Sequence, residues 1–191
     1  ARYLFQIIVL FLLLGFSSYS ADLYWVGGSG SWNDASHWSS SSGGVGGIGV
    51  PTQSDNVFIN HQSFNAKGQY ITISGDVSVQ SINWLPTELT PELRGKKSAN
   101  IFVYGSFNLL DNSLNSFAGS IYFKGLGENS ISIKTPINAN LNFAGLGSWN
   151  LSSDITTSKN ISITRGSLYT SGFAVNAHIF SGNGVEQRLL K

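Results

Sequence analysis

Four copies of one short pattern decide the fold: Asn100-Ile101-Phe102-Val103-Tyr104-Gly105, Ser120-Ile121-Tyr122-Phe123-Lys124-Gly125, Asn140-Leu141-Asn142-Phe143-Ala144-Gly145 and Asn160-Ile161-Ser162-Ile163-Thr164-Arg165-Gly166. Successive copies begin 20 residues apart, and the fourth has one additional residue before its glycine. Each copy starts with a small polar residue, places two large apolar residues one position apart, and ends with a glycine. This alternation predicts a β-strand with one buried face.

A repeat of this length, with strand-sized units and no helical pattern between them, is typical of a β-solenoid. Equivalent residues of successive coils would stack about 4.8 Å apart. We therefore expect a polar ladder along one corner, formed by Asn100, Ser120, Asn140 and Asn160. The apolar positions of the four copies would stack inside. The alternative is an antiparallel sandwich with evenly spaced strands, but the constant spacing favours the solenoid.

The fold class that we predict is all-β: a single-stranded parallel β-helix with coils of about 20 residues and a tryptophan-rich N-terminal cap. Abundant Gly, Ser and Asn, with few helix formers, agree with an all-β chain that has many turns. We expect a right-handed solenoid, because the hexapeptide regularity of the left-handed type is absent.

Composition excludes several classes of function. Only 11% of residues are charged and the net charge is +1, so no electrostatic feature points to nucleic acid. The densest basic cluster is Arg94-Gly95-Lys96-Lys97, which we interpret as a solvated loop. The chain has no cysteine, which excludes disulfides, thiolate metal sites and cysteine nucleophiles.

Residues 1–20 have the layout of a secretory signal peptide. Arg2 precedes an apolar run from Tyr3 to Phe16, and Ser18-Tyr19-Ser20 provides small residues for cleavage before Ala21. The run is short for a membrane span, which needs about 20 apolar residues. A retained anchor is the alternative. We expect a secreted protein with no stable membrane span after cleavage.

Residues 21–56 form a segment rich in Trp, Gly and Ser. Trp25, Trp32 and Trp38 lie within 14 residues, and a glycine-rich loop and Val50-Pro51-Thr52 follow. The first coil of a solenoid has an open edge and an exposed core end, which bulky aromatic side chains can cover. We therefore predict that this segment is the N-terminal cap. A second interpretation is that the three tryptophans form a stacking platform for sugar rings.

The motifs Trp-Val-Gly-Gly-Ser-Gly-Ser-Trp at 25–32, His-Trp-Ser at 37–39, Val-Pro-Thr at 50–52 and Asp-Asn-Val at 55–57 carry a resemblance to a known family. They resemble the start of large secreted surface proteins of Bacteroidetes. Those proteins are adhesin-like chains with many repeats, some exported by the type 9 secretion system and some linked to gliding motility. The stretches 147–155 and 166–175 also resemble the solenoid coils of such proteins. The resemblance therefore spans residues 21–182 and implies an architecture rather than an activity. It carries no catalytic residue across to this chain.

The coils are expected over residues 57–191. Ile71 to Gly75 matches the repeated pattern, and Leu85 to Ser98 is interpreted as an inserted loop. Residues 177–182 start another coil and residues 186–191 the strand after it, with no capping segment. We expect the solenoid to be truncated at its C-terminus and to belong to a longer chain.

No pattern of catalytic, cofactor-binding or metal-binding residues emerges. Gly44-Val45-Gly46-Gly47-Ile48-Gly49 matches a dinucleotide fingerprint, but no helix is predicted to follow it. His37, His61 and His178 have no metal-binding spacing, and Asp34 with His37 lacks a nucleophilic serine. The acidic residues do not repeat at the coil period, so they do not stack into a groove. We expect no catalytic residue, no cofactor and no metal.

The sequence therefore predicts a non-catalytic structural or adhesive segment of a secreted cell-surface protein. Its expected partners are surface glycans or other cell-surface proteins, and nucleic acid is not among them. Two alternatives remain: a carbohydrate-binding module that presents the three tryptophans, and the non-catalytic start of a polysaccharide-degrading β-helix enzyme.

Overall fold

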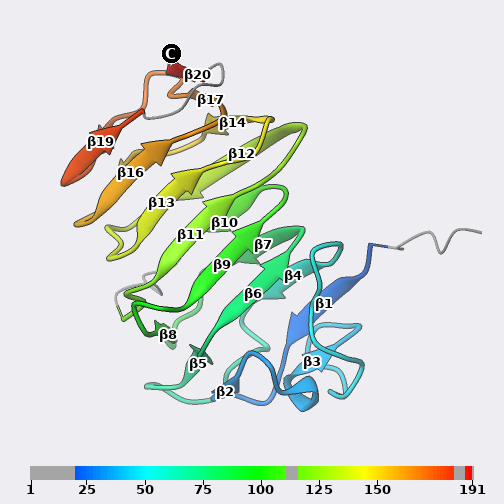
Figure 1. The fold of residues 1–191 in the computed structure, drawn as a ribbon. Helices are drawn as coiled ribbons and strands as arrows, with labels where there is room; N and C mark the ends of the chain where they lie inside the picture. Colours follow the sequence, from blue (N-terminus) through cyan, green and yellow to red (C-terminus); the bar gives the residue numbers. More distant parts are fainter. Residues whose placement is uncertain (1–19, 111–115, 183–187, 191) are drawn as a thin grey trace, which may run out of the picture.

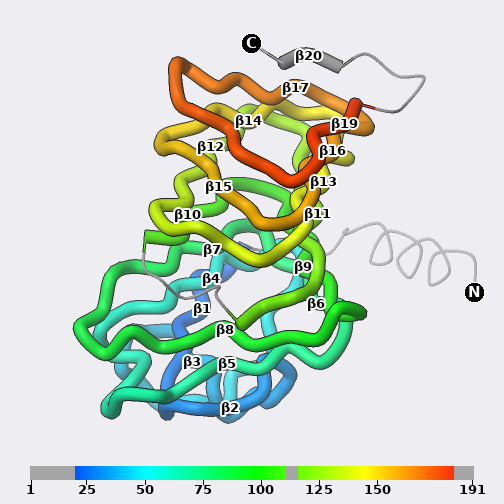
Figure 2. The backbone as a smooth tube through the Cα atoms, turned by 90° about the vertical axis from the view of Figure 1, so that its left-hand side faces the viewer, coloured from blue at the N-terminus to red at the C-terminus, as the bar shows by residue number. Residues whose placement is uncertain are grey.

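The protein is a β-solenoid in which strands from successive coils stack into two long sides and a third, interrupted side (Figures 1 and 2). The computed structural model describes residues 20–110, 116–182 and 188–190. Within these ranges there is no α-helix, and one 3-10 turn, η1, spans Ala35–His37. The coils follow one another along the axis from the N-terminal to the C-terminal part of the chain, as the colours of Figure 2 make plain.

Sheet A, the first side, has nine strands in the spatial order β20 (Arg188–Leu190), β17 (Gly166–Tyr169), β14 (Ser148–Leu151), β12 (Glu128–Ile133), β10 (Phe107–Leu109), β7 (Ser81–Trp84), β4 (Asn56–Ile59), β1 (Asp22–Trp25) and β3 (Trp38–Ser39). All of its pairs are parallel except β1 with β3.

Sheet C, the other long side, has six parallel strands in the order β19 (Ile179–Ser181), β16 (Asn160–Ile163), β13 (Asn140–Phe143), β11 (Ser120–Phe123), β9 (Asn100–Val103) and β6 (Asp76–Val79). Side B lies between sheets A and C along the chain. It contains a three-stranded sheet, β2 (Gly30–Ser31), β5 (Tyr70–Ile73) and β8 (Glu92–Gly95), and farther along the axis the pair β15 (Ile155–Thr156) and β18 (Val175–Asn176). Single bridges, Gly95 with Phe117 and Ile137 with Thr157, continue this side between them.

The chain passes through A, B and C in turn, so each parallel neighbour comes from the next coil. β4, β5 and β6 make one coil, and β7, β8 and β9 make the next. This topology excludes the antiparallel sandwich and confirms the parallel β-solenoid. The right-handed sense stays a prediction, and it agrees with the strong preference of parallel crossovers for that hand.

The core is a set of apolar columns that run along the solenoid axis. On sheet C, Ile101, Ile121 and Leu141 are aligned in register and fully buried. In the next column the rings of Phe123 and Phe143 stack with centroids 4.7 Å apart. Each large side chain that is buried in this way contributes about 1.5–3 kcal/mol. The alternation of apolar and polar residues in the repeated pattern therefore predicts which side chains are buried in the core.

The glycine that ends each repeat lies at the corner between sheets C and A, where backbones of neighbouring coils approach closely. A Cβ atom on Gly105 would lie 2.7 Å from the carbonyl oxygen of Gln80, and one on Gly145 would lie 2.3 Å from that of Gly125. These distances are too short for a side chain. The glycines are required by the stacking of coils rather than by the strand itself.

The first coil starts earlier than the expected boundary at residue 57. β1 pairs in parallel with β4, aligning Leu23 with Val57, and β2 pairs in parallel with β5. The segment 21–56 therefore contains the first coil of the solenoid as well as the turn η1 and the antiparallel strand β3. The sequence pattern hid this coil because β2 is only two residues long.

Two further assignments in the early coils differ from the expectation. Ile71 aligns with Leu93 on side B, whereas the residue stacked on Ile101 is Val77. The stretch 85–98 is not a simple loop, because it contains β8 with Leu93 buried. Short strands with one inward apolar residue have no distinctive sequence pattern. The side of the solenoid to which such a strand belongs is therefore determined by the strand of the neighbouring coil with which it pairs.

Candidate functional site

The three tryptophans of the N-terminal segment are core residues. Trp25, Trp32 and Trp38 are 0%, 1% and 0% exposed, and the ring of Trp38 contacts both others edge-on. The Nε1 of Trp38 donates to the carbonyl oxygen of Trp32 at 2.7 Å, and that of Trp25 to the carbonyl oxygen of Gly28 at 2.7 Å. A sugar ring needs an exposed aromatic face. None of the three offers one, so the stacking platform suggested by the sequence is wrong.

The polar side chains of the repeat lie in one row on the outward surface of sheet C. Asn100 aligns with Ser120 and Ser120 with Asn140, and the pairing of β13 with β16 brings Asn160 into the same row. The Nδ2 of Asn100 donates to Asp76 Oδ1 at 2.7 Å, which extends the row by one coil. Asn140 Nδ2 reaches Ser120 Oγ at 3.4 Å. The row stabilises neighbouring coils by modest hydrogen bonds.

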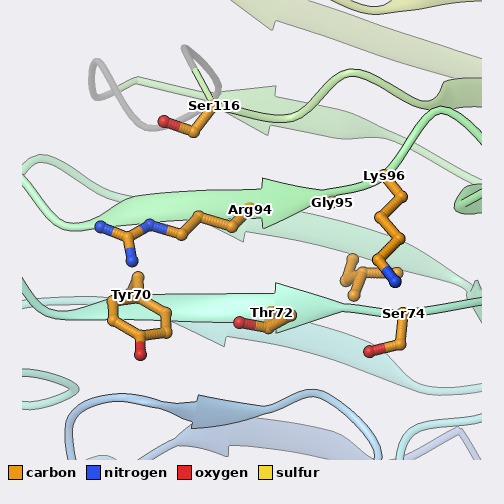
Figure 3. Close-up of a pocket in the computed structure, with 8 residues that line it drawn as sticks. Tyr70, Thr72, Ser74, Arg94, Gly95, Lys96 and Ser116 are labelled. Carbon is orange, nitrogen blue, oxygen red and sulfur yellow. The ribbon is translucent and has the colours of Figure 1, made fainter.

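A groove on side B is the candidate functional site. It has a volume of about 440 Å³ and lies over the outward face of the paired strands β5 and β8. It is lined by residues of the two strands, by the residue that follows Ile73 and the one that follows Gly95, and by one residue of the next coil: Tyr70, Thr72, Ile73, Ser74, Arg94, Gly95, Lys96 and Ser116. Figure 3 shows the Arg94 and Tyr70 side chains at one end, Lys96 and Ser74 at the other, and Thr72 between them.

Arg94 is held in place by two neighbours. Its Nε donates to Glu92 Oε2 at 3.0 Å, and its guanidinium carbon lies 3.8 Å from the centre of the Tyr70 ring. Ser116 Oγ donates to the same carboxylate oxygen at 2.9 Å. The hydrogen bond from Arg94, followed by that from Ser116, lowers the pKa of Glu92 below its ordinary value. The carboxylate stays charged and fixes the orientation of the guanidinium.

The other end of the groove carries a second cation. Lys96 is exposed and extends toward Ser74 in Figure 3. It forms no ion pair with any residue of the described ranges. Thr72 faces the groove because it is directly aligned with Arg94 across β5 and β8. The groove thus combines two cations with hydroxyl groups on a rigid parallel sheet.

A second hollow, of about 500 Å³, is lined by His61, Pro86, Thr87, Glu88 and Leu89. It lies among loops rather than on paired strands. Its one acid and one histidine are not accompanied by a third metal-ligating side chain, since the described residues contain no group of three or more His, Asp or Glu that could hold a metal ion.

The residues weighed for catalysis have structural contacts. His37 stacks flat on Trp25 with centroids 4.6 Å apart, and its Nδ1 lies 2.7 Å from the carbonyl oxygen of Val26. Asp34 caps η1 by accepting from the backbone N–H and the hydroxyl of Ser36, and these bonds lower its pKa. The glycine-rich stretch 44–49 is loop, and a Cβ on Gly46 would overlap the carbonyl oxygen of Ser36. That stretch packs on the cap and opens no helix.

Comparisons with known proteins add no relative. No family model, no curated protein and no solved structure matches the chain. Among the described residues, no helix has the length and apolar character needed to cross a membrane.

The sequence does not reveal the groove, because neither of its two halves has a distinctive pattern. Arg94-Gly95-Lys96 has the composition of a solvated loop, although Glu92, Arg94 and Lys96 alternate as outward positions of a strand do. Tyr70, Thr72 and Ser74 alternate in the same way. Only the alignment of Tyr70 with Glu92 brings the two sets together.

Proposed function

We propose that the chain is a non-catalytic structural and adhesive segment of a secreted cell-surface protein. The observation that carries this proposal is the unbroken register of the solenoid. Parallel strands on sheets A and C pair coil after coil, with fully buried apolar columns between them. Such an array is stiff along its axis, because each coil is fixed by hydrogen bonds and packing to the one before it.

The outward surface supports an adhesive role. Side chains on a stacked sheet are held at fixed spacing, so a partner meets a preorganised surface and loses less entropy on binding. The groove on side B provides one defined contact site on this rod. Repeated weak contacts on a multivalent surface can sum to firm attachment.

Secretion is the part of the proposal that rests on sequence. The signal-peptide pattern of residues 1–20 lies outside the described residues except for Ser20. The resemblance to secreted Bacteroidetes surface proteins rests on the motifs between residues 25 and 57 and on the stretches 147–155 and 166–175. Both support export and display on the cell surface. The partners that we propose are surface glycans or other cell-surface proteins.

Cell-surface display can be tested with an antibody raised against residues 21–191. We expect the antibody to label intact cells of the source organism, and the signal to disappear when a protease is added outside the cells. Fab fragments of the same antibody should reduce attachment of the cells to their natural surface. Antigen that is found only inside the cells and resists the external protease would contradict the proposal.

A carbohydrate-binding module is the second candidate. The tryptophans no longer support it, but the groove does, because hydroxyl-bearing and cationic side chains converge there. This candidate is compatible with an adhesive rod, since sugar binding would then be the means of adhesion.

A further inference from the structure

We propose that the groove over β5 and β8 binds an anionic sugar unit, such as a carboxylated or sulfated residue of a polysaccharide. This inference rests on the proposed adhesive function and names the ligand class of its contact site. The recognition would come from Arg94 and Lys96 for the anionic group, and from Thr72 and Ser74 for neighbouring hydroxyls.

The charge of the groove favours an anion. Arg94 lies on β8 and Lys96 directly follows the strand, two residues further on, so their side chains extend on the same side about 7 Å apart at the backbone. Glu92 is the nearby acid, and Arg94 and Ser116 already occupy its Oε2. One negative charge facing two positive charges leaves the groove with a net positive charge.

The guanidinium of Arg94 is prepared for a planar oxyanion. Glu92 fixes its Nε and the Tyr70 ring supports its flat face, so few rotamers remain to be lost on binding. A guanidinium pairs with carboxylate and sulfate-like groups through two parallel hydrogen bonds, which an ammonium cannot do. Glu92 and Tyr70 are therefore positioning residues for Arg94.

The remaining lining favours a sugar over a nucleic acid strand. Single-stranded nucleic acid is held by stacking its bases on exposed aromatic faces. The one aromatic residue of the groove is Tyr70, and Arg94 covers a face of its ring. The hydroxyl groups of Thr72 and Ser74 are instead suited to exchange hydrogen bonds with sugar hydroxyls. An open groove on a flat sheet also accepts a unit within a long polymer.

Calorimetric titration of the purified chain tests the ligand class. The probes are a polyuronate oligosaccharide, the same oligosaccharide with its carboxylates reduced to alcohols, a sulfated oligosaccharide and a single-stranded oligonucleotide. We expect binding to the uronate or to the sulfated sugar, and at least tenfold weaker binding to the carboxyl-reduced sugar. Comparing the affinities for the uronate and for the sulfated oligosaccharide identifies which anion the groove prefers.

Matched variants locate the binding. Arg94→Gln and Lys96→Gln should each weaken binding of the charged sugar by about threefold to tenfold, as expected for a partly exposed charge contact. Lys124→Gln removes the same charge from the corner after sheet C and should leave the affinity unchanged. Lys96 is exposed, so its variant keeps the fold even if Arg94→Gln does not, and a melting curve checks both.

Four outcomes would overturn the inference: no binding of either charged sugar, equal affinity for the neutral sugar, equal weakening by Lys124→Gln, or preferential binding of the oligonucleotide. Binding in solution does not depend on where the cell places the protein. A chain that binds acidic sugar but is not displayed on cells would refute the proposed function alone, and a displayed chain that binds none would refute this inference alone.

Discussion

The buried tryptophans differ in how their indole N–H groups are satisfied. Trp25 and Trp38 donate to backbone carbonyl oxygens, whereas Trp32, Trp84 and Trp149 bury an Nε1 that has no partner. A buried donor without a partner costs about 1–3 kcal/mol. Tryptophans of equal burial therefore contribute unequally to the stability of the fold.

We predict that Trp38→Phe destabilises the protein by about 2 kcal/mol more than Trp149→Phe. Both changes remove similar volume from the core, but the first also loses a hydrogen bond and the second removes an unpaired donor. Denaturant unfolding of the two variants beside the parent measures the difference. Equal losses of unfolding free energy would show that the indole hydrogen bond is not a significant contribution.

Glu92 gives a pH-dependent contribution to stability. Its pKa is lowered in the folded protein by Arg94 and then Ser116, so its stabilising effect is present above the ordinary glutamate pKa of about 4.3 and is lost as the pH falls through the folded value. Because the pair is partly exposed, the effect is at most about 1 kcal/mol. We expect Glu92→Gln to lower the Tm more at pH 7 than at pH 3, because the stabilising effect of the carboxylate is lost as it becomes protonated.

Melting curves of parent and Glu92→Gln between pH 7 and pH 3 test this expectation. Asp34 also has a lowered pKa, from its hydrogen bonds with Ser36, so the variant should retain part of the acid-induced loss of stability. A Tm difference between the two proteins that stays constant over the whole range would contradict the assignment.

At the scale of the elements, the corner after each strand of sheet C decides whether coils can stack. Gly145 has two atoms of the coil beneath it, Gly125 O and Lys124 C, within 2.4 Å of the place where a Cβ would stand. Gly75 follows β5 with the same local pattern, yet a Cβ there would meet nothing within 4 Å. Two glycines that look alike in the sequence thus have different roles.

We predict that Gly145→Ala destabilises the protein by roughly 3 kcal/mol, because the backbone of two coils must move apart. Gly75→Ala should be neutral or stabilising by up to about 1 kcal/mol, because it reduces the entropy of the unfolded chain. Chemical denaturation of both variants provides the comparison. The close-approach argument fails if Gly75→Ala is the more damaging change.

At the scale of the whole molecule, stability should be a sum over neighbouring coils, since each coil contacts the ones above and below it. The register makes one coil removable. Phe123 and Phe143 are aligned on sheet C, so deletion of residues 124–143 joins equivalent points of two coils. On sheet A the same deletion would place Leu151 where Ile131 now lies on Phe107.

We predict that the chain lacking residues 124–143 folds, with a β-sheet circular dichroism spectrum and a lower Tm. Deletion of residues 124–133 is the control, because it removes about half a coil and leaves β13 opposite the wrong side. That variant should not fold cooperatively. Loss of folding in the full-coil deletion would mean that the coils do not act as separable units.

The sequence alone determined the class of fold and most of its later coils. The alternation within each repeat fixes which side chains are buried, and the constant spacing on sheet C from Ile101 to Ile161 fixes which residues stack. Both are local properties of a strand or of one regular coil. They can be read without knowing the rest of the molecule.

Only the tertiary structure determined the strand pairing of the early coils and the location of the groove. Coils of unequal length place Val77 beneath Ile101 and Tyr70 beside Glu92. Neither strand pairing can be predicted from a repeated spacing in the sequence. The same stacking buries the three N-terminal tryptophans that the sequence offered as a binding platform. The physical reason is that the register between irregular coils depends on which coil lies beneath. The exposure of a large side chain depends on the same neighbour. These contacts between coils form only when the whole chain folds.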